Sequence, residues 1–248
     1  MKTIQSILLL GFALLLFAGC AKDNYAAPDA GINGTLIDAQ TGGSLELSET
    51  GLNSNVRMIV NDPAKYPAPS PLPDLVVKSD GTYANSRIFS ESYKVFPLAR
   101  SGPWQYLGDS TKVTIGQGQN PTVNFKVAPY FYISTPTVST ADSSVTFTIT
   151  KSTVATITNN LSATNNLLIL INNYNIVDEA ICTNTQGKYY QNQWQTTVTN
   201  ASLNTPFKAN YSFSAMHLPH GTYYLRVAVI GSGSSGKYNY SPVVKITL

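Results

Sequence analysis

The chain has 248 residues and a formal net charge of +3; only 12% of its residues are charged, whereas 43% are hydrophobic. No cluster of lysine and arginine could follow a phosphate backbone, so nucleic acid is excluded as an expected partner. The apolar content excludes a disordered polyelectrolyte and is enough to bury the core of one large or two small β domains.

The N-terminus predicts export and lipid attachment. Met1 and Lys2 give a positive start, and the apolar run over 7–17 is too short to span a bilayer permanently, which is typical of a signal peptide. Small residues then precede Cys20, and this end resembles the lipobox that is cleaved once lipid joins the thiol. We expect a signal peptide over 1–19 and an anchor of acyl chains on Cys20. The alternative is a plain secretory signal with a chance cysteine.

Residues 20–29 are expected to form a lipidated tether. Lys22 and Asp23 follow the cysteine closely, and this short patch resembles the signal that sends lipoproteins of Bacteroidetes to the outer face of the outer membrane. The expected location is therefore the outer membrane, lipid-anchored and exposed at the cell surface. The simpler alternative is a polar spacer that lets the folded part stand away from the lipid.

Cys182 is the only thiol left once Cys20 carries lipid. A single thiol can form no intramolecular disulfide and can build no cysteine zinc site. Its apolar neighbours Ala180 and Ile181 favour a small buried side chain over a reactive nucleophile. Stability is expected to come from packing.

The remaining chain predicts an all-β protein. Short segments rich in Val, Ile, Thr, Tyr and Phe recur between Gly, Pro, Asn and Asp residues, and helical periodicity is hard to find. The predicted strands are 31–39, 56–61, 75–79, 82–85, 93–97, 111–115, 122–127, 131–135, 144–150, 166–172, 193–199, 207–213, 222–230 and 243–248.

Two features punctuate the first half of the chain. Asp80 and Gly81 favour the positive φ angles of a tight hairpin, which predicts a turn between the strands 75–79 and 82–85. The prolines within 63–73 remove donors that a sheet would need, so this stretch is expected to be an exposed loop and a place for contacts with a partner.

The segment 127–130, Val-Ala-Pro-Tyr, marks a junction between two domains. We place the first domain at 30–128 and the second at 129–248. The short, regularly spaced strands of the second domain are typical of an immunoglobulin-like or fibronectin-like β-sandwich. Its last two strands are expected to form a closing hairpin around a loop rich in glycine and serine.

A resemblance to a known family covers essentially the whole mature chain. It is carried by residues of the tether, of the predicted turns and strand starts, and of the junction: Asp23-Asn24-Tyr25, Ala27-Pro28-Asp29-Ala30-Gly31, Gly34-Thr35, Asp38, Thr41-Gly42, Asp80-Gly81-Thr82-Tyr83, Asn85, Phe89, Tyr93 and Val127-Ala128-Pro129-Tyr130. Together these residues resemble the Bacteroides lipoprotein family of domain of unknown function 3823, which is found in glycan-utilisation loci.

The resemblance implies a fold and a setting. The first domain should be a β-sandwich similar to the prealbumin-like carboxypeptidase regulatory fold, followed by the C-terminal sandwich. The implied partners are an outer-membrane glycan importer and its surface-binding lipoprotein. The shared motifs are turns and strand starts, so the family transfers no active site.

Catalytic and metal sites gain no support from the residues. His217 and His220 lie three apart across a turn that contains proline, and no third metal ligand is near them in the sequence. Asp178 and Glu179 are adjacent, and neighbours in an extended segment point to opposite sides, which disfavours joint work on one glycosidic bond. We expect a protein that is not an enzyme and that holds no cofactor or metal.

Rings that alternate with amides supply the candidate ligand-binding residues. An aromatic ring can stack on the C–H face of a sugar while neighbouring amides bind its hydroxyls. The candidates are Trp104 and Tyr106, and Tyr189 and Tyr190. Trp194 is expected in the core of the sandwich, where a buried tryptophan is common. Trp104 follows Ser-Gly-Pro, which makes it the better surface candidate.

Two functions follow as expectations. The first is a non-enzymatic accessory lipoprotein of a surface glycan-uptake system, which binds oligosaccharide weakly or presents it to the importer. The second is a structural subunit whose loops or open sheet edge dock a partner protein without touching sugar. In the second case Trp104, Tyr189 and Tyr190 would be packed inside.

Overall fold

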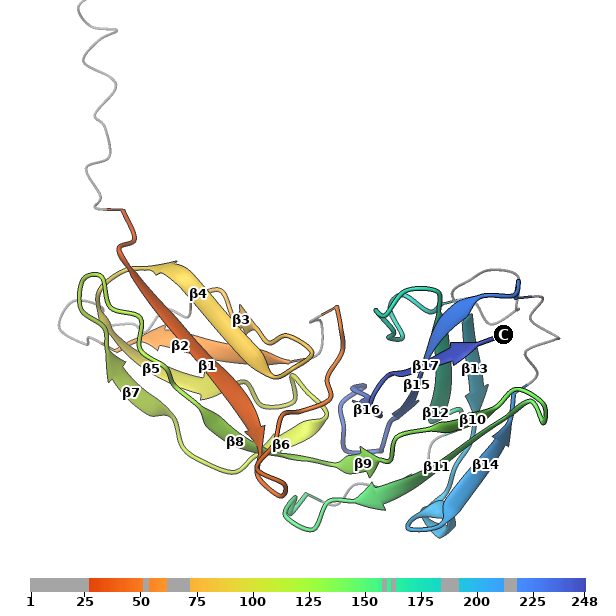
Figure 1. Cartoon of the computed structure of the whole chain (residues 1–248). Coiled ribbons are helices and arrows are strands. Elements are labelled where there is room, and N and C mark those ends of the chain that lie inside the picture. The colour runs from red at the N-terminus through yellow and green to blue at the C-terminus, as the bar shows by residue number, and fades with distance from the viewer. Residues whose placement is uncertain are drawn as a thin grey trace, which may run out of the picture.

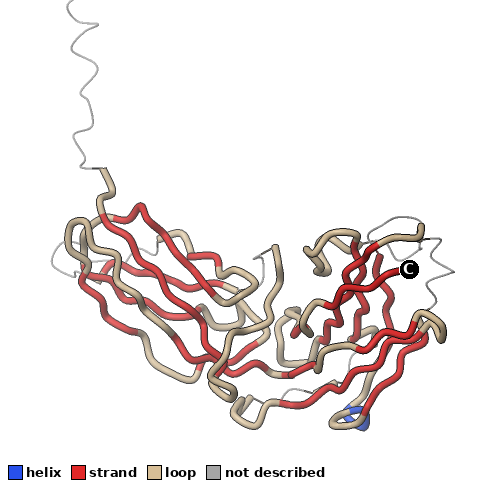
Figure 2. The backbone as a smooth tube through the Cα atoms, viewed as in Figure 1, coloured by secondary structure: helices blue, strands red, loops and turns tan. Residues whose placement is uncertain are grey.

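The structure, a computed structural model, describes residues 27–50, 54–61, 72–157, 160–161, 164–183, 192–211 and 218–248. These residues form strands, loops and one 3-10 turn, Asn200–Ser202 (Figures 1 and 2). The strands build two β-sandwiches, which meet where β8 (Phe125–Pro129) runs into β9 (Phe131–Ile133) (Figure 1). The predicted all-β fold is confirmed. Within the described residues, no helix is long and apolar enough to cross a membrane.

The N-terminal sandwich consists of two four-stranded sheets. The first has the order β4-β1-β8-β6, with β4 at Thr82–Ile88, β1 at Ala30–Asp38 and β6 at Trp104–Tyr106. The second has the order β3-β2-β5-β7, with β3 at Leu75–Val76, β2 at Asn55–Val60, β5 at Ser92–Pro97 and β7 at Thr111–Thr114. β1 pairs with β4 antiparallel and with β8 parallel, so it lies inside its sheet.

Alternation of side chains builds the core of this domain. Along β1 buried and half-buried positions alternate from Ile32 to Asp38, as expected for a strand with one face against a core. Ile32 and Leu36 are 0% exposed there, and Met58 and Val95 meet them from the other sheet. Full burial of an aliphatic side chain of this size contributes about 1.5–3 kcal/mol.

The Asp80-Gly81 turn forms as predicted but does not close a hairpin. Gly81 has a φ of 82°, and Asp80 Oδ1 accepts hydrogen bonds from the backbone and the hydroxyl of Thr82. The flanking strands lie in different sheets, because β3 pairs with β2 and β4 pairs with β1. The local signal determines the turn, whereas the partners of each strand come from elsewhere in the chain.

The C-terminal sandwich also has two sheets. In the first, β11 (Ser144–Lys151) pairs with β9, β10 (Thr137–Ser139) and β14 (Pro206–Asn210). In the second, β12 (Leu167–Asn172) lies between β13 (Asn192–Thr196) and β15 (Thr222–Val229), and β15 also pairs with β16 (Asn239–Tyr240) and β17 (Val244–Thr247). The predicted closing hairpin is present as β15 and β17, with β16 paired nearer the loop.

Strand β12 is buried on both faces. Leu167, Ile169 and Ile171 face the core between the sheets, whereas Leu168 and Leu170 pack on the opposite face with Cys182 and its neighbours. A strand covered on both sides needs no polar alternation, which explains its continuous apolar sequence. The second face is covered by the loop that holds Val177 and Cys182, and Asp178 of that loop bonds to the N-terminal domain.

Three short strands were not predicted: β6, β10 and β16. Each has two or three residues, too few to show the period-two alternation on which a strand prediction depends. The predicted loop over 63–73 falls mostly outside the described residues. Trp194 is half-buried and packs against the core of the second domain, edge-on to Tyr211 with ring centres 6.1 Å apart, so the core position predicted for it is confirmed only in part.

Candidate functional site

A buried arginine links the two domains. Arg226 in β15 is 0% exposed, and its Nη1 donates to the backbone oxygen of Leu47 at 2.8 Å while its Nη2 donates to Glu46 at 2.9 Å. Within its own domain, Nε donates to the backbone oxygen of Ser241 at 2.7 Å. The Arg226 Cζ lies 4.4 Å from the centre of the Tyr240 ring. The guanidinium therefore holds the loop after β1 against the second domain.

A buried carboxylate makes a second link. Asp178 is 0% exposed, and its Oδ2 accepts hydrogen bonds from the Ser48 hydroxyl and from the Thr50 backbone, both at 2.9 Å. Its Oδ1 accepts from the backbone of Ala180 and Ile181 at 3.1 Å. Asp178 thus joins the same loop of the first domain to the loop after β12.

Two glutamines of the first domain bind a loop of the second. Gln40 Oε1 accepts from the Thr153 backbone at 2.9 Å, and Gln105 Oε1 accepts from the Thr156 and Ile157 backbones at 2.8 and 3.0 Å. These amides satisfy backbone groups that follow the end of β11. Together with Arg226 and Asp178, they fix the domains against each other at several separate points.

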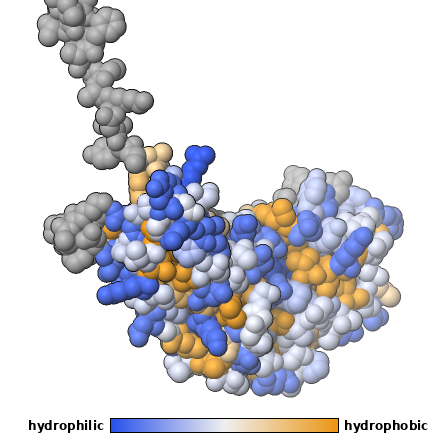
Figure 3. Space-filling view, turned by 60° about the vertical axis from the view of Figure 1, so that its left-hand side comes forward, coloured by the Kyte–Doolittle hydropathy of each residue, from blue (hydrophilic) through white to orange (hydrophobic). Residues whose placement is uncertain are grey.

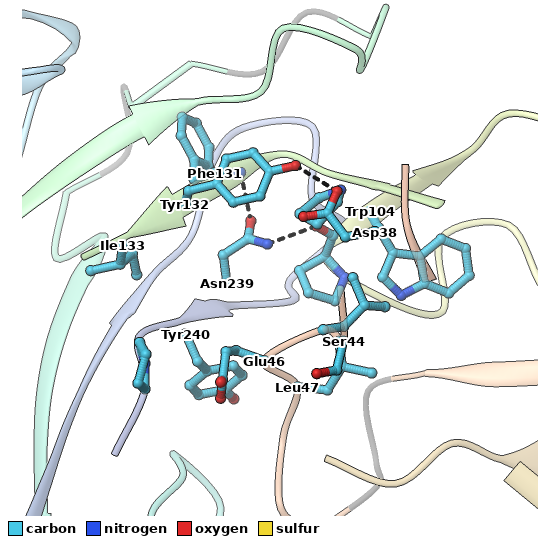
Figure 4. A pocket seen from close by; sticks show the side chains of 14 residues that line it. Asp38, Ser44, Glu46, Leu47, Trp104, Phe131, Tyr132, Ile133, Asn239 and Tyr240 are labelled. Carbon is cyan, nitrogen blue, oxygen red and sulfur yellow. Dashed lines mark hydrogen bonds between the residues drawn. The ribbon is translucent and has the colours of Figure 1, made fainter. Parts of the chain in front are cut away.

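The junction contains a cavity of about 150 Å³, lined from both domains (Figure 4). The Tyr132 hydroxyl donates to Asp38 at 2.8 Å. Asn239 donates to the backbone oxygen of Pro103 at 2.9 Å and accepts from the Phe131 backbone at 3.2 Å (Figure 4). Because these polar groups already bind one another, they have little capacity left for a ligand. The cavity belongs to the structure of the junction.

Trp104, the leading surface candidate from the sequence, is in the core. It is 1% exposed in β6, and its Nε1 donates to the Ser54 hydroxyl at 3.0 Å. Gly102 makes room for the indole, since a Cβ there would lie 2.0 Å from Nε1. The prediction of an exposed ring was wrong, because the preceding Ser-Gly-Pro bend turns the indole into the sandwich rather than out to solvent.

The side chains of Tyr106 and Gln105 are also occupied by contacts with other residues of the protein. Tyr106 is half-buried, packs edge-on against Phe125 with ring centres 5.8 Å apart, and donates its hydroxyl to the backbone oxygen of Asp109. The Gln105 amide is occupied at the domain junction. The segment from Trp104 to Tyr106 is therefore a structural strand and not a sugar platform.

Several predicted residues lie outside the described part of the chain: Cys20, Tyr189, Tyr190 and His217. Their predicted roles stay predictions. Cys182 is 0% exposed, and burial raises the pKa of its thiol to about 12, so its expected place as a small buried side chain is confirmed.

The acidic pair of the second domain is divided between two structural contacts. Asp178 bonds across the junction, whereas Glu179 accepts a hydrogen bond from the Tyr240 hydroxyl. Among the described residues, no three His, Cys, Asp or Glu side chains gather where a metal ion could bind.

Among the described residues, an exposed tyrosine between asparagines forms a ring-and-amide surface. Tyr174, in the loop after β12, is 64% exposed, with Asn173 and Asn175 on either side. The side chain of Asn172 donates to the backbone oxygen of Ile176 at 2.6 Å and closes the loop. We call residues 173–176 the amide–tyrosine loop. Because the loop is already held by this hydrogen bond, it loses little conformational entropy when a ligand binds to the ring.

The sequence contained the signal for this loop. Asn173, Tyr174 and Asn175 repeat the alternation of ring and amide that singled out the other candidates, directly after a predicted strand.

The space-filling view shows polar and apolar side chains interspersed over both domains, with a depression between them (Figure 3).

Comparisons with known proteins show which proteins this architecture is similar to. Residues 30–128 match the family model described as Protein of unknown function (DUF3823) N-terminal domain. A solved DUF3823 family protein from Parabacteroides merdae is 22% identical, with a TM-score of 0.63 and coverage of 89% of this chain and 100% of that chain. One from Bacteroides ovatus is 19% identical, with a TM-score of 0.61 and coverage of 88% and 99%.

A third solved structure, from Bacteroides uniformis, is named as that of a candidate carbohydrate binding protein. It is 19% identical, with a TM-score of 0.60 and coverage of 89% of this chain and 100% of that chain. At these identities the likeness concerns the fold, and it spans both domains. No curated protein matches the chain in sequence.

Proposed function

Residues 30–128 belong to the DUF3823 family as its N-terminal domain, as the sequence resemblance predicted, and from this premise we propose a function for the whole chain. It is a non-enzymatic, lipid-anchored accessory protein of a glycan-uptake system, and it binds oligosaccharide through the amide–tyrosine loop. The proposed setting is the outer membrane beside a glycan importer and its surface lipoprotein.

The observation that carries sugar binding is the exposure of Tyr174 between two asparagines. The ring supplies a flat apolar face for stacking, and the amides can both donate to and accept from hydroxyls. Ile176, 45% exposed, extends the apolar surface beside the ring. The similar Bacteroides uniformis protein, named as a candidate carbohydrate binder, supports the same class of ligand.

Tyr174→Ala is expected to weaken oligosaccharide binding by about tenfold or more, because it removes the stacking face. The soluble mature chain, residues 21–248, would be run against a broad glycan panel by affinity electrophoresis, with calorimetry on the best ligand. Phe89→Ala is the matched control: Phe89 is also exposed, at 48%, but lies in the N-terminal domain. Equal weakening by both variants, or no binding to any glycan by the folded protein, contradicts the proposal.

Lipid anchoring is tested at Cys20. Cells that express the full chain are expected to incorporate labelled palmitate into it and to keep it in the outer-membrane fraction. Cys20→Ser is expected to abolish labelling and to remove the protein from the outer-membrane fraction, because acyl chains on that thiol are the proposed anchor. Protease treatment of intact cells then reports whether the anchored protein faces outward. A Cys20→Ser protein that still incorporates palmitate, or that still reaches the outer-membrane fraction, would exclude this anchor.

A second function, protein docking without sugar, is favoured by one observation. Trp104, which the sugar-platform prediction placed on the surface, is packed in the core, as expected for a structural subunit. In that case the mature chain would bind no glycan and would still copurify with the importer complex from the native membrane.

A further inference from the structure

A second cavity, of about 290 Å³, lies at the domain junction away from the amide–tyrosine loop. We call it the arginine pocket; it is lined by Arg100, Tyr130, Ile157, Ser232, Gly233 and Ser235. Arg100 comes from the turn between β5 and β6 in the first domain, and the serines come from the loop between β15 and β16 in the second. That loop and the amide–tyrosine loop are at opposite ends of β12.

The polar side chains of this pocket all carry donors. They are one guanidinium, one phenol and two serine hydroxyls, and no lining residue has a carboxylate. Within the described part of the chain, Arg100 forms no ion pair and the Tyr130 hydroxyl forms no hydrogen bond. Such a set favours a ligand that supplies negative charge and several acceptors.

Arg100 and Tyr130 act on each other electrostatically. Burial raises the pKa of Tyr130, and the positive charge of Arg100 works in the opposite direction. The phenol therefore remains protonated at neutral pH and can donate a hydrogen bond. Arg100 also has a φ of 63°, in the left-handed region that long side chains rarely adopt, and such backbone strain concentrates at functional sites.

We propose that the arginine pocket binds a sugar that bears a carboxylate, such as a hexuronate. The carboxylate pairs with the Arg100 guanidinium and accepts from the Tyr130 hydroxyl. The Ile157 side chain, 47% exposed, meets the C–H face of the ring, and the serine hydroxyls bind its hydroxyls. The volume is that of roughly ten water molecules, which is enough for one sugar ring. This site extends the proposed sugar binding to an acidic class of glycan.

The test uses the soluble mature chain and follows amide shifts by NMR during titration with glucuronate, glucose, acetate or sulfate. Glucuronate is expected to bind most tightly and to shift the amides of 232–235. Arg100→Gln is expected to weaken glucuronate binding by about tenfold or more, because a charge-assisted bond is lost. Tyr130→Phe removes one hydroxyl and should weaken binding less. Arg87→Gln, a matched exposed arginine of the first domain, should have no effect.

Several outcomes would overturn the proposal. If glucose binds as tightly as glucuronate, the carboxylate charge plays no role in binding. Acetate or sulfate binding as tightly as glucuronate would make the pocket a plain anion site. If Arg87→Gln weakens glucuronate binding as much as Arg100→Gln does, the effect comes from the net charge of the protein and not from the pocket. Arg100→Gly is a second variant, expected to lose binding while its melting temperature is unchanged or higher, because glycine accepts the left-handed φ.

The two sugar sites can be separated in the same experiments. Tyr174→Ala should leave glucuronate binding to the arginine pocket unchanged, and Arg100→Gln should leave neutral oligosaccharide binding unchanged. If the amide–tyrosine loop binds no oligosaccharide but glucuronate still binds, the proposal of the arginine pocket stands. Loss of glucuronate binding in Tyr174→Ala would move the acidic ligand to that loop and refute the pocket.

Discussion

Arg226→Met is expected to destabilise the protein by about 3 kcal/mol, because it removes a buried guanidinium and leaves its partners unpaired. Methionine nearly fills the space but donates nothing, so the buried carbonyls of Leu47 and Ser241 lose their partners, at about 1–3 kcal/mol each. The Glu46 side chain is 50% exposed and can be rehydrated, which keeps the loss at the lower end of the usual range.

The same variant should uncouple the two domains. Each domain has one tryptophan, Trp104 in the first and Trp194 in the second, so fluorescence in Trp→Phe backgrounds reports on one domain at a time. Urea transitions of the two domains are expected to coincide in the parent and to separate after Arg226→Met. The control is Arg57→Met, whose pair with Asp74 at 2.8 Å is 34% and 21% exposed.

A solvent-exposed pair contributes little to stability, so the Arg57→Met midpoints should stay together and shift little. If Arg226→Met shifts them no more than Arg57→Met does, the contacts of Arg226 across the junction add nothing to stability. Separate transitions already present in the parent would show that the junction does not couple the domains.

Gly34→Ala is expected to destabilise the N-terminal domain by about 3 kcal/mol, at the upper end for overpacking. A Cβ at Gly34 would lie 1.8 Å from the backbone oxygen of Val123 and 2.5 Å from the Tyr83 hydroxyl. The Tyr83 hydroxyl donates to that same Val123 oxygen, so neither atom can withdraw without breaking a buried hydrogen bond. The backbone of β1 would have to move instead.

The measurement is urea unfolding followed by Trp104 fluorescence. Gly43→Ala is the matched control, because a Cβ there meets nothing closer than the Thr41 hydroxyl at 3.5 Å. A change of this kind at the surface is expected to stay within about 0.5 kcal/mol. Equal stability of the two variants would show that β1 and β4 can separate locally to admit a methyl group.

Gly34 illustrates what a sequence pattern can and cannot explain. The pair Gly34-Thr35 contributed to the family resemblance, but nothing adjacent in the sequence requires a glycine there. The requirement comes from Tyr83, opposite Gly34 in the β1–β4 register, and from Val123 beyond it. It arises only when three distant segments meet.

The burial of Arg226 is easier to recognise in the sequence. A single charge in the apolar strand from Leu225 to Val229 indicates a buried cation that needs partners. Its partners in the first domain lie about 180 positions away, so their identity could not be inferred from the strand. The amide–tyrosine loop was more accessible to prediction, because its ring and amides are consecutive.

The sequence by itself determined the features that depend on local periodicity and turn chemistry: the all-β class, most of the longer strands and the Asp80-Gly81 turn. Alternation and positive φ angles act over a few neighbouring residues, so they can be recognised in one segment. Tertiary structure alone decided the sheet assignment of β3 and β4, the burial of Trp104 and the partners of Arg226. These depend on contacts between residues far apart in the chain, whose free energies appear only once both segments are in place.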